Sequence, residues 1–283
     1  MQSPNTAQVR QILRQALAED RVRQDVTTKA LISQTLKCKA SLVVKARGTI
    51  AGTEIAKEVF LSVDPGLKVT VLIQDGIEVK PGDVIAIIEG KTSSILKAER
   101  VALNFLQRLS GIASETTRYV QAVKGLPVII MDTRKTTPGL RTLEKYAVRV
   151  GGGNNHRMNL EDGILIKDNH IAVLRHQKLK ISEIVSKARQ EASPQFKIEI
   201  EVKTPEEAAQ AAEAGADIIL LDNMNPEQMR RAVGLLKGRV LIEASGGITL
   251  ENVRAVAETG VDRISIGALT HSPKALDISL ELE

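Results

Sequence analysis

Short apolar runs alternate with helical segments through the second half of the chain, and this alternation limits the fold more than any other feature. The helical segments, among them residues 204–214, 226–236 and 250–259, are rich in alanine and glutamate and long enough to connect strands. Repeated strand–helix units in one direction predict a parallel sheet, either doubly wound or closed into a barrel. The six predicted strands cover residues 128–132, 163–168, 197–202, 217–222, 240–245 and 263–267.

The loop after the first of these strands favours the barrel. A doubly wound nucleotide-binding fold normally places Gly-x-Gly-x-x-Gly directly after its first strand. This chain has Thr133-Arg134-Lys135-Thr136 at that place.

The first part of the chain has a different organisation. Apolar residues at helical spacing predict an amphipathic helix from about Thr6 to Glu19. Three β-rich runs follow, with a helical stretch at residues 54–61, and a long helix begins at Ser94. These patterns predict a mixed α+β unit that ends near Gly90. The runs cover residues 41–45, 67–73 and 83–88.

The carboxyl end of each predicted barrel strand is polar or glycine. In a barrel of this kind the carboxyl-terminal rim holds the catalytic loops, so the pattern predicts one site to which all six strands contribute. The alternative is that strand ends are polar only because loops are solvated. The six residues are Asp132, Lys167, Glu201, Asp222, Ser245 and Gly267.

The alternation of side chains along each strand turns further polar residues toward the barrel interior. If Glu201 faces inward, so does Glu199, and the same parity turns Glu243, Arg263 and Ser265 inward. Unpaired buried charges cost several kcal/mol, so these groups require partners. We expect Glu243 to pair with Arg263 for structural reasons.

Five potential cations stand in the Thr133–Thr136, His156-Arg157 and Lys167–His170 motifs, and the nearby carboxylates are too scattered to neutralise them. This predicts a site for a multiply charged anion. Gly151-Gly152-Gly153 alone is a weak signal, because three glycines can simply serve a sharp turn. The triplet is informative because it precedes His156-Arg157, which is expected to bind a ligand. His170 and His176 are expected to be structural. The cations are Arg134, Lys135, His156, Arg157 and Lys167.

Two glycine motifs follow the last two strands and predict a phosphate site. Ser245-Gly246-Gly247-Ile248 and Ile266-Gly267-Ala268 let backbone N–H groups approach an anion closely. Many barrels bind phosphate at this position. A generic glycine turn is the competing interpretation of either motif alone.

Composition excludes several other functions. The net charge of +5 suits nucleic acid as well as small anions, but aromatic residues make up only 2% and there is no Trp, so base stacking has little support. The single cysteine, Cys38, excludes an intramolecular disulfide or a cysteine-based zinc cluster. No apolar run is long enough to cross a membrane, and no secretion signal is recognisable. We therefore expect no nucleic acid, no membrane and a cytoplasmic location.

One long segment closely resembles the quinolinate phosphoribosyltransferase family, also called nicotinate-nucleotide pyrophosphorylase (carboxylating). It runs from Asp132 to Arg141 and continues with Glu144–Val148, Gly151–Gly153 and His156-Arg157. The resemblance covers nearly the whole chain. One departure is Arg23-Gln24-Asp25-Val26-Thr27, where Gln24 replaces a glycine usual in the family. Further matching motifs are Glu99-Arg100, Ser110–Ala113, Lys167–His170, Glu199–Val202, Leu221–Met224, Glu243–Ile248 and Leu269–Ser272.

The resemblance implies transfer of phosphoribosyl from phosphoribosyl pyrophosphate to the ring nitrogen of quinolinate. The 2-carboxylate is lost as CO₂, pyrophosphate is released, and nicotinate mononucleotide is formed for NAD synthesis. The implied fold class is α/β, with an N-terminal α+β sandwich domain followed by an incomplete parallel α/β barrel. We expect the first domain at residues 1–112, the barrel at residues 113–272, and a tail at 273–283 that returns to the first domain. The implied assembly is a homodimer or a hexamer of dimer units.

The resemblance and the residue patterns imply compatible roles. The five cations suit a dicarboxylate, and Arg100 is implied to reach into the neighbouring subunit, although an ordinary surface arginine is the alternative. Glu201 and Asp222 would stabilise positive charge on the ribose or bind Mg²⁺. Lys135 and Lys167 join them as expected catalytic residues. The residues expected to hold the 5-phosphate are Ser245, Gly246, Gly247 and Gly267.

Two other functions remain open at this point. A related transferase for nicotinate or a molybdenum-pathway ligand would share the barrel and the phosphate loops but should lack cations for a second carboxylate. A basic protein that binds nucleotides or nucleic acid would bind phosphates without turnover. Inward-facing Glu201 and Asp222 would repel such a polyanion.

Overall fold

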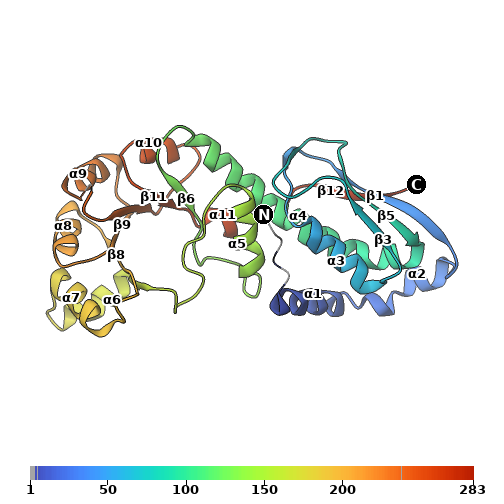
Figure 1. Cartoon of the computed structure of the whole chain (residues 1–283), viewed down its shortest axis with the longest axis horizontal. Coiled ribbons are helices and arrows are strands. Elements are labelled where there is room, and N and C mark those ends of the chain that lie inside the picture. The colour runs from blue at the N-terminus through green and yellow to red at the C-terminus, as the bar shows by residue number, and fades with distance from the viewer. Residues whose placement is uncertain (1–3, 5, 237) are drawn as a thin grey trace. The chain divides into compact units, whose positions relative to one another are not determined.

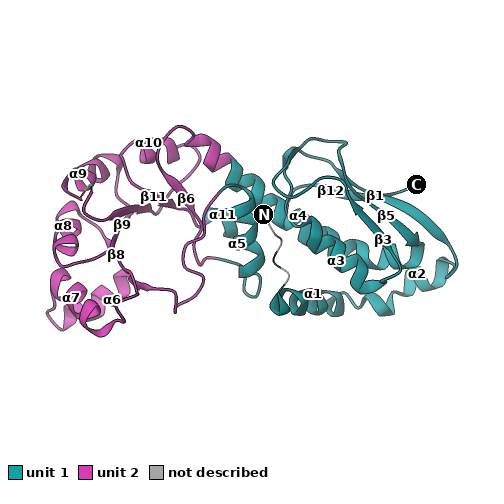
Figure 2. Cartoon of the chain, viewed as in Figure 1, with its two compact units in different colours: residues 1–117, 136–152, 268–283 teal, residues 118–135, 153–267 magenta. Residues whose placement is uncertain are grey.

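The computed structural model describes residues 4, 6–236 and 238–283, which form two compact units. Unit 1 comprises residues 1–117, 136–152 and 268–283, and unit 2 comprises residues 118–135 and 153–267 (Figure 2). The two units are therefore interleaved along the chain. No helix in the described part of the chain is both long and apolar enough to cross a membrane.

Unit 1 is built on a four-stranded antiparallel sheet in the order β12-β1-β5-β3 (Figure 1). A small antiparallel ribbon joins β2 and β4. The strands are β1 (Lys37–Val44), β2 (Gly48–Thr49), β3 (Lys68–Val71), β4 (Glu78–Val79), β5 (Val84–Lys91) and β12 (Ile278–Leu282). The helices that lie wholly in the ranges of unit 1 are α1 (Ala7–Glu19), α2 (Val26–Leu31), α3 (Thr53–Val63), α5 (Arg141–Val150) and α11 (Ala268–His271).

The helix predicted at the start of the chain is confirmed as α1. The hydroxyl of Thr6 accepts a hydrogen bond from the Val9 backbone N–H at 3.2 Å, which caps the helix. Val9, Leu13 and Leu17 are buried at helical spacing. The predicted strands at 41–45, 67–73 and 83–88 are confirmed as β1, β3 and β5, and the helix at 54–61 as α3.

A long helix, α4 (Thr92–Ala122), follows β5 and confirms the helix predicted from Ser94. Close approach to this helix explains Gly151. A Cβ on Gly151 would collide with the Ala113 carbonyl oxygen and would lie 2.7 Å from Thr116 Cβ. Gly152 adopts a positive φ of 88°. Packing and a sharp turn therefore account for the first two glycines of the triplet.

The departure at Gln24 leaves the backbone unstrained. Among the described non-glycine residues, positive φ occurs at Arg21, Lys178 and Asn223, and Gln24 does not share it. Gln24 ends a short 3₁₀ helix, Val22–Gln24, and Asp25 then caps α2 by accepting a hydrogen bond from the Thr28 N–H at 2.9 Å. No glycine is needed at position 24 for its conformation.

Unit 2 contains a six-stranded parallel sheet in the order β6-β11-β10-β9-β8-β7. All six predicted strands are confirmed. Within the described residues, β6 and β7 are the two edge strands, so the barrel is incomplete. The strands are β6 (Ile129–Met131), β7 (Ile164–Ile166), β8 (Ile198–Val202), β9 (Ile218–Asp222), β10 (Leu241–Ser245) and β11 (Arg263–Ser265).

Helices connect these strands and cover the outer face of the sheet (Figure 1). Apolar residues such as Ile198, Ile219 and Ala244 are buried between the strands and helices. The helices are α6 (Asp168–His176), α7 (Ile181–Glu191), α8 (Pro205–Glu213), α9 (Pro226–Leu236) and α10 (Val253–Ala257). The α/β fold class predicted from the sequence is confirmed.

Candidate active site

The parallel sheet of unit 2 brings the polar strand ends to one edge. Ser245 on β10 is in register with Asp222 on β9 and with Ser265 on β11. Glu201 on β8 is in register with Leu220 on β9, so Glu201 and Asp222 belong to the same face of neighbouring strands. The predicted common edge is thus present.

Lys167 and Glu201 are the closest predicted pair at this edge. Lys167 follows β7 at the N-cap of α6, and its Nζ lies 2.7 Å from Glu201 Oε1. The Asp168 backbone N–H donates to Glu201 Oε2 at 3.4 Å. The Lys167 side chain keeps 45% of its surface exposed, against 14% for Glu201. A substrate anion can therefore reach the ammonium group while the carboxylate stays partly enclosed.

Glu201 and Asp222 are the two residues that the sequence predicts to hold Mg²⁺. Asp222 Oδ1 accepts a hydrogen bond from Asn223 Nδ2 at 3.0 Å, and Glu201 is held by Lys167. Mg²⁺ in proteins usually takes one or two carboxylates together with substrate phosphate oxygens and water. These two carboxylates match that preference without further protein ligands.

The predicted phosphate loop has the backbone that an anion site needs. Gly246 and Gly247 have positive φ values of 92° and 62°. A Cβ on Gly246 would collide with the amide oxygen of Asn223. Asn223 itself has a φ of 54°, and its backbone N–H donates to the Ser245 carbonyl at 2.9 Å. The loops after β9 and β10 are therefore packed together through Asn223, a contact that the strand-end pattern did not predict.

Arg134 and Arg157 both belong to unit 2, and their positive charges interact. Burial and the positive charge of Arg134 lower the pKa of Arg157, although Glu199, Glu201 and Asp162 act in the opposite direction. Two neighbouring guanidinium groups repel unless an anion lies between them. Lys135 is exposed, and its backbone N–H donates to the Thr133 hydroxyl at 3.0 Å.

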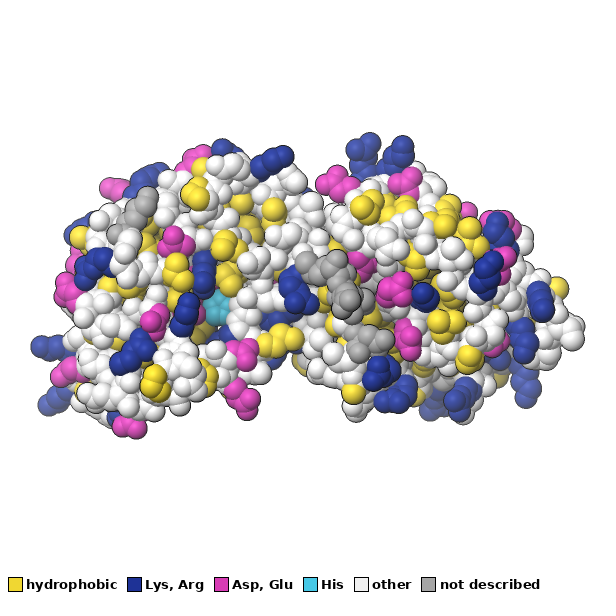
Figure 3. Space-filling model, in the orientation of Figure 1, with side chains coloured by type: hydrophobic (Ala, Val, Ile, Leu, Met, Phe, Trp, Pro, Cys, Tyr) yellow, Lys and Arg dark blue, Asp and Glu magenta, His cyan; other side chains and the backbone are white. Residues whose placement is uncertain are grey.

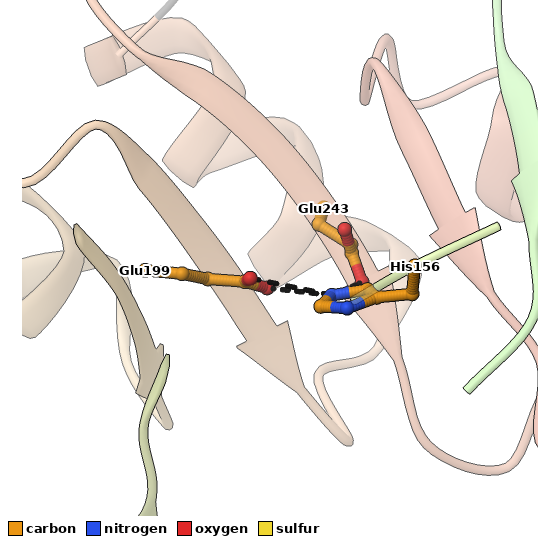
Figure 4. A group of neighbouring side chains, drawn as sticks. All are labelled: His156, Glu199 and Glu243. Carbon is orange, nitrogen blue, oxygen red and sulfur yellow. Dashed lines mark hydrogen bonds and ion pairs between the residues drawn. The ribbon is translucent and has the colours of Figure 1, made fainter. Parts of the chain in front are cut away.

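His156 lies against two buried glutamates, and only 11% of its side-chain surface is exposed (Figure 4). Its Nε2 is 3.2 Å from Glu199 Oε2 and 3.5 Å from Glu243 Oε1. Glu199 and Glu243 therefore face inward, as their strand parity predicts. The expected pair of Glu243 with Arg263 is wrong for the described residues: the two are in strand register, but the ion pair of Glu243 is with His156.

The protonation of this cluster reflects opposing effects. Burial lowers the pKa of His156, but the hydrogen bonds and charges of Glu199 and Glu243 outweigh it and raise the pKa to about 9. Burial also raises the pKa of Glu199. The Arg157 N–H donates to His156 Nδ1 at 2.7 Å, and this hydrogen bond opposes the protonation of Nδ1 that the two glutamates favour. A proton on Nδ1 would displace this backbone hydrogen bond.

Asp132 holds the segment that carries His156. The Asp132 side chain is fully buried, and its two oxygens accept hydrogen bonds from Asn155 Nδ2 at 2.6 Å and from the His156 N–H at 2.8 Å. Asp132 was predicted at the rim as a strand-end residue. In the structure it binds the protein's own backbone.

A cavity of about 380 Å³ opens beside these residues. Its lining includes His156, Arg157, Glu199 and Arg263. Most of the remaining lining, such as Lys197 and Ile218, lies at the amino ends of the strands. The cavity is therefore at the end of the barrel opposite the strand ends that carry Lys167, Glu201 and Asp222.

Arg100 and Gly267 complete the predicted set. Arg100 is exposed on α4, in the part of that helix assigned to unit 1. Gly267 directly precedes α11 after β11. On the face of the molecule drawn in Figure 3, basic and acidic side chains are interspersed and form no continuous basic stripe.

Comparison with known proteins gives matches along the whole chain. Residues 25–110 match the family model of the quinolinate phosphoribosyl transferase N-terminal domain, and residues 112–281 match that of its C-terminal domain. A probable nicotinate-nucleotide pyrophosphorylase [carboxylating] of Bacillus subtilis is 45% identical over 98% of this chain and 94% of its own length. Quinolinate phosphoribosyltransferase [decarboxylating] 2, mitochondrial, of Nicotiana glauca is 40% identical over 98% of this chain and 83% of its own length.

A solved structure gives the same result. The crystal structure of NadC from Streptococcus pyogenes matches with a TM-score of 0.95 and 42% identity, covering 100% of this chain and 99% of that one. The chain belongs to the quinolinate phosphoribosyltransferase family.

Proposed function

We infer that the chain transfers phosphoribosyl from phosphoribosyl pyrophosphate to quinolinate with decarboxylation. The products are nicotinate mononucleotide, CO₂ and pyrophosphate, and the reaction is a step of NAD biosynthesis. Family membership over both domains supports this function. The observation in the structure that carries it is the edge of the parallel sheet where Lys167 Nζ contacts Glu201 Oε1 at 2.7 Å and Asp222 belongs to the same face of the next strand.

Quinolinate is a dianion, and we assign its carboxylates to the cationic side chains. The positive charges of Arg134 and Arg157 interact, and each would gain from an anion between them. Lys167 keeps 45% of its side-chain surface exposed, so its pair with Glu201 can be shared with substrate. Lys135 is exposed and is assigned to the phosphoribosyl donor or the acceptor. His156 was expected to bind substrate directly, and its contacts with Glu199 and Glu243 instead favour an indirect role.

The ring nitrogen of quinolinate forms a bond to the anomeric carbon of the ribose as the bond to pyrophosphate breaks. Positive charge develops on the ribose, and a carboxylate nearby lowers the barrier electrostatically. Glu201 and Asp222 suit that role. The quaternised ring then accepts the electron pair of the leaving 2-carboxylate as CO₂ departs, and a proton replaces it at that carbon.

The phosphoribosyl donor requires anchors for its phosphates. Gly246 and Gly247 present a backbone open to a close anion, and Ser245 and Gly267 flank the same edge of the sheet. Mg²⁺ bound by Glu201 and Asp222 would neutralise charge on the pyrophosphate group.

The assembly and location are further parts of the proposal. The exposed position of Arg100 on α4 is compatible with a homo-oligomer, a dimer or a hexamer of dimer units, in which Arg100 enters the site of a neighbouring subunit. An Arg100→Ala variant should then lose turnover, and mixing it with a Glu201→Ala variant should restore part of it through hybrid sites. A cytoplasmic location is expected.

A single assay tests the function. Protein, quinolinate, phosphoribosyl pyrophosphate and Mg²⁺ are incubated while CO₂ and nicotinate mononucleotide are measured, with nicotinate as a parallel acceptor and a chelator as the metal control. We expect equal amounts of CO₂ and nucleotide from quinolinate, none from nicotinate, and loss of both on chelation. Product from nicotinate alone would identify a transferase that does not decarboxylate.

Two variants test the division of roles in the site. Glu201→Ala should reduce kcat more than it weakens quinolinate binding, because Glu201 acts on charge that develops in the transition state. Arg157→Ala should mainly raise the KM for quinolinate. Equal effects of both changes on KM alone would contradict these assignments.

A further inference from the structure

We call the cluster of His156, Glu199 and Glu243 the histidine clamp. It connects barrel strands that are not neighbours in the sheet. Glu199 lies on β8 and Glu243 on β10, and β9 lies between these two strands. The His156 ring therefore contacts two non-neighbouring strands from inside the barrel (Figure 4).

The segment before the ring is attached to an edge of the sheet. The Asn154 N–H donates to the Ile130 carbonyl at 2.8 Å, and the Asp132 N–H donates to the Asn154 carbonyl at 3.1 Å. Met131 and Asn154 form a parallel β-bridge. This isolated bridge attaches the segment before His156 to β6, on the side away from β11. The clamp thus connects this segment to β8 and β10.

Arg157 follows this segment, and two hydrogen bonds hold it in place. Its backbone N–H donates to His156 Nδ1 at 2.7 Å. Its guanidinium Nη1 donates at 3.3 Å to the carbonyl of Gly163, the residue before β7. Arg157 therefore lies on the stretch of chain that connects β6 to β7, the two edge strands of the sheet. A shift of the His156 ring would therefore move the Arg157 backbone.

The burial of the clamp makes such a shift costly. Glu243 is fully buried and Glu199 is 5% exposed. The oxygens of Glu243 have no hydrogen-bond partner of good geometry, so its main compensation is the ion-pair contact with His156 at 3.5 Å. Arg263 adds positive charge near Glu199. The imidazole therefore has one favourable position, in contact with both carboxylates.

We propose that Glu199 and Glu243 are positioning residues, which hold the His156 ring and through it place Arg157 for a carboxylate of the acceptor. This proposal rests on the proposed function only for the identity of the group that Arg157 binds, a carboxylate of quinolinate. Glu199 and Glu243 do not need to touch the substrate for this effect.

The test uses Glu199→Gln and Glu243→Gln, which keep the side-chain size and remove the charge. We expect each variant to raise the KM for quinolinate about tenfold, because small displacements of a binding group have large kinetic effects, with the KM for phosphoribosyl pyrophosphate changed less than about twofold. The matched control is Asp217→Asn at the start of β9, since Asp217 pairs with Arg189 and accepts from the Ile198 N–H without contacting the clamp. This control should leave both KM values unchanged.

A double-mutant cycle shows whether the glutamates act through His156. Adding Glu243→Gln to His156→Asn should produce no further rise in the quinolinate KM, since the intermediary is already gone. Additive effects would overturn the proposal. So would equal rises in both KM values, which would indicate a general loss of structure.

A spectroscopic measurement tests the positioning without turnover. The side-chain Nε–H resonance of Arg157 should shift in Glu243→Gln and stay in place in Asp217→Asn. An unchanged Arg157 resonance would overturn the proposal even if activity fell. If the unmodified protein failed to convert quinolinate, the proposed function would be wrong. The Arg157 resonance would still show whether the histidine clamp positions Arg157.

The same three side chains could instead hold a cation, because their ligand atoms lie within 4.8 Å of one another. Titration with Zn²⁺ distinguishes the two roles. We expect no binding that depends on Glu243. Stoichiometric binding that is lost in Glu243→Gln would replace the positioning role with a metal site.

Discussion

Removal of the buried carboxylate of Glu144 should destabilise unit 1 substantially. Glu144 lies on α5 and is fully buried. Its Oε1 accepts hydrogen bonds at 2.8 Å from Arg108 Nη2 and from the Thr137 hydroxyl, and its Oε2 accepts from the Thr137 N–H at 3.0 Å. Glu144→Ala removes these acceptors together and leaves a cavity.

The expected loss of unfolding free energy depends on how exposed Arg108 is, because Arg108 loses its ion-pair partner. Breaking a buried ion pair by removing one partner costs about 3–5 kcal/mol. The Arg108 side chain is 29% exposed, so water can solvate part of its charge, and we expect the lower end, about 3 kcal/mol. For a chain of this size, that corresponds to a fall in Tm of about 6 °C.

Tyrosine fluorescence provides the assay for unit 1. The chain has no Trp and two tyrosines, Tyr119 in unit 2 and Tyr146 in unit 1. In a Tyr119→Phe background, the urea or thermal transition followed by Tyr146 reports on unit 1. Glu89→Ala is the control, because its ion pair with Lys68 is exposed and should contribute less than about 1 kcal/mol. Equal shifts for Glu144→Ala and Glu89→Ala would refute the reasoning.

Three further predictions concern particular sites. Gly246→Ala should raise the KM for phosphoribosyl pyrophosphate, because a side chain would strain the positive φ and collide with Asn223; an unchanged KM would remove Gly246 from the phosphate site. Gly111→Ala should lower the urea midpoint of unit 1, since its Cβ would collide with the backbone carbonyl of Lys274, and a midpoint equal to the unmodified protein would contradict this. Because the pKa of His156 is raised to about 9, its stabilising effect should be complete below about pH 6.5 and lost as the pH rises through 9. The free energy of unfolding in urea, measured for the unmodified protein and for His156→Asn at pH 6, 7.5 and 9.5, should therefore differ less as the pH rises. A constant difference in this free energy would mean that Nδ1 stays bonded to Arg157 throughout.

Much of the fold could be predicted because its signals are local. Each strand of unit 2 is a short apolar run between turn residues, and α1 shows helical spacing over its whole length. The inward direction of Glu199 and Glu243 also followed from strand parity alone. The parallel direction of the strands then placed Glu201 and Asp222 at one edge.

The partners of these residues could not be predicted in the same way. His156 contacts side chains on β8 and β10, which come later in the chain, and nothing local distinguishes it from a histidine that binds substrate. Glu243 and Arg263 are in register, so their pairing was a reasonable expectation, but His156 reaches Glu243 instead. The role of Asn223 depends on its contact with Gly246, which belongs to a different loop. Such contacts depend on tertiary packing, which a single sequence does not display.

The pairing of β12 with β1 also has a consequence for the order in which the protein can fold during synthesis. Leu42 on β1 is in register with Leu280 on β12, so an edge strand of the first sheet is translated after all of unit 2. Until then, β1 keeps one side of its backbone unpaired and is exposed to pairing with other chains. Unit 1 therefore begins first on the ribosome but is completed last.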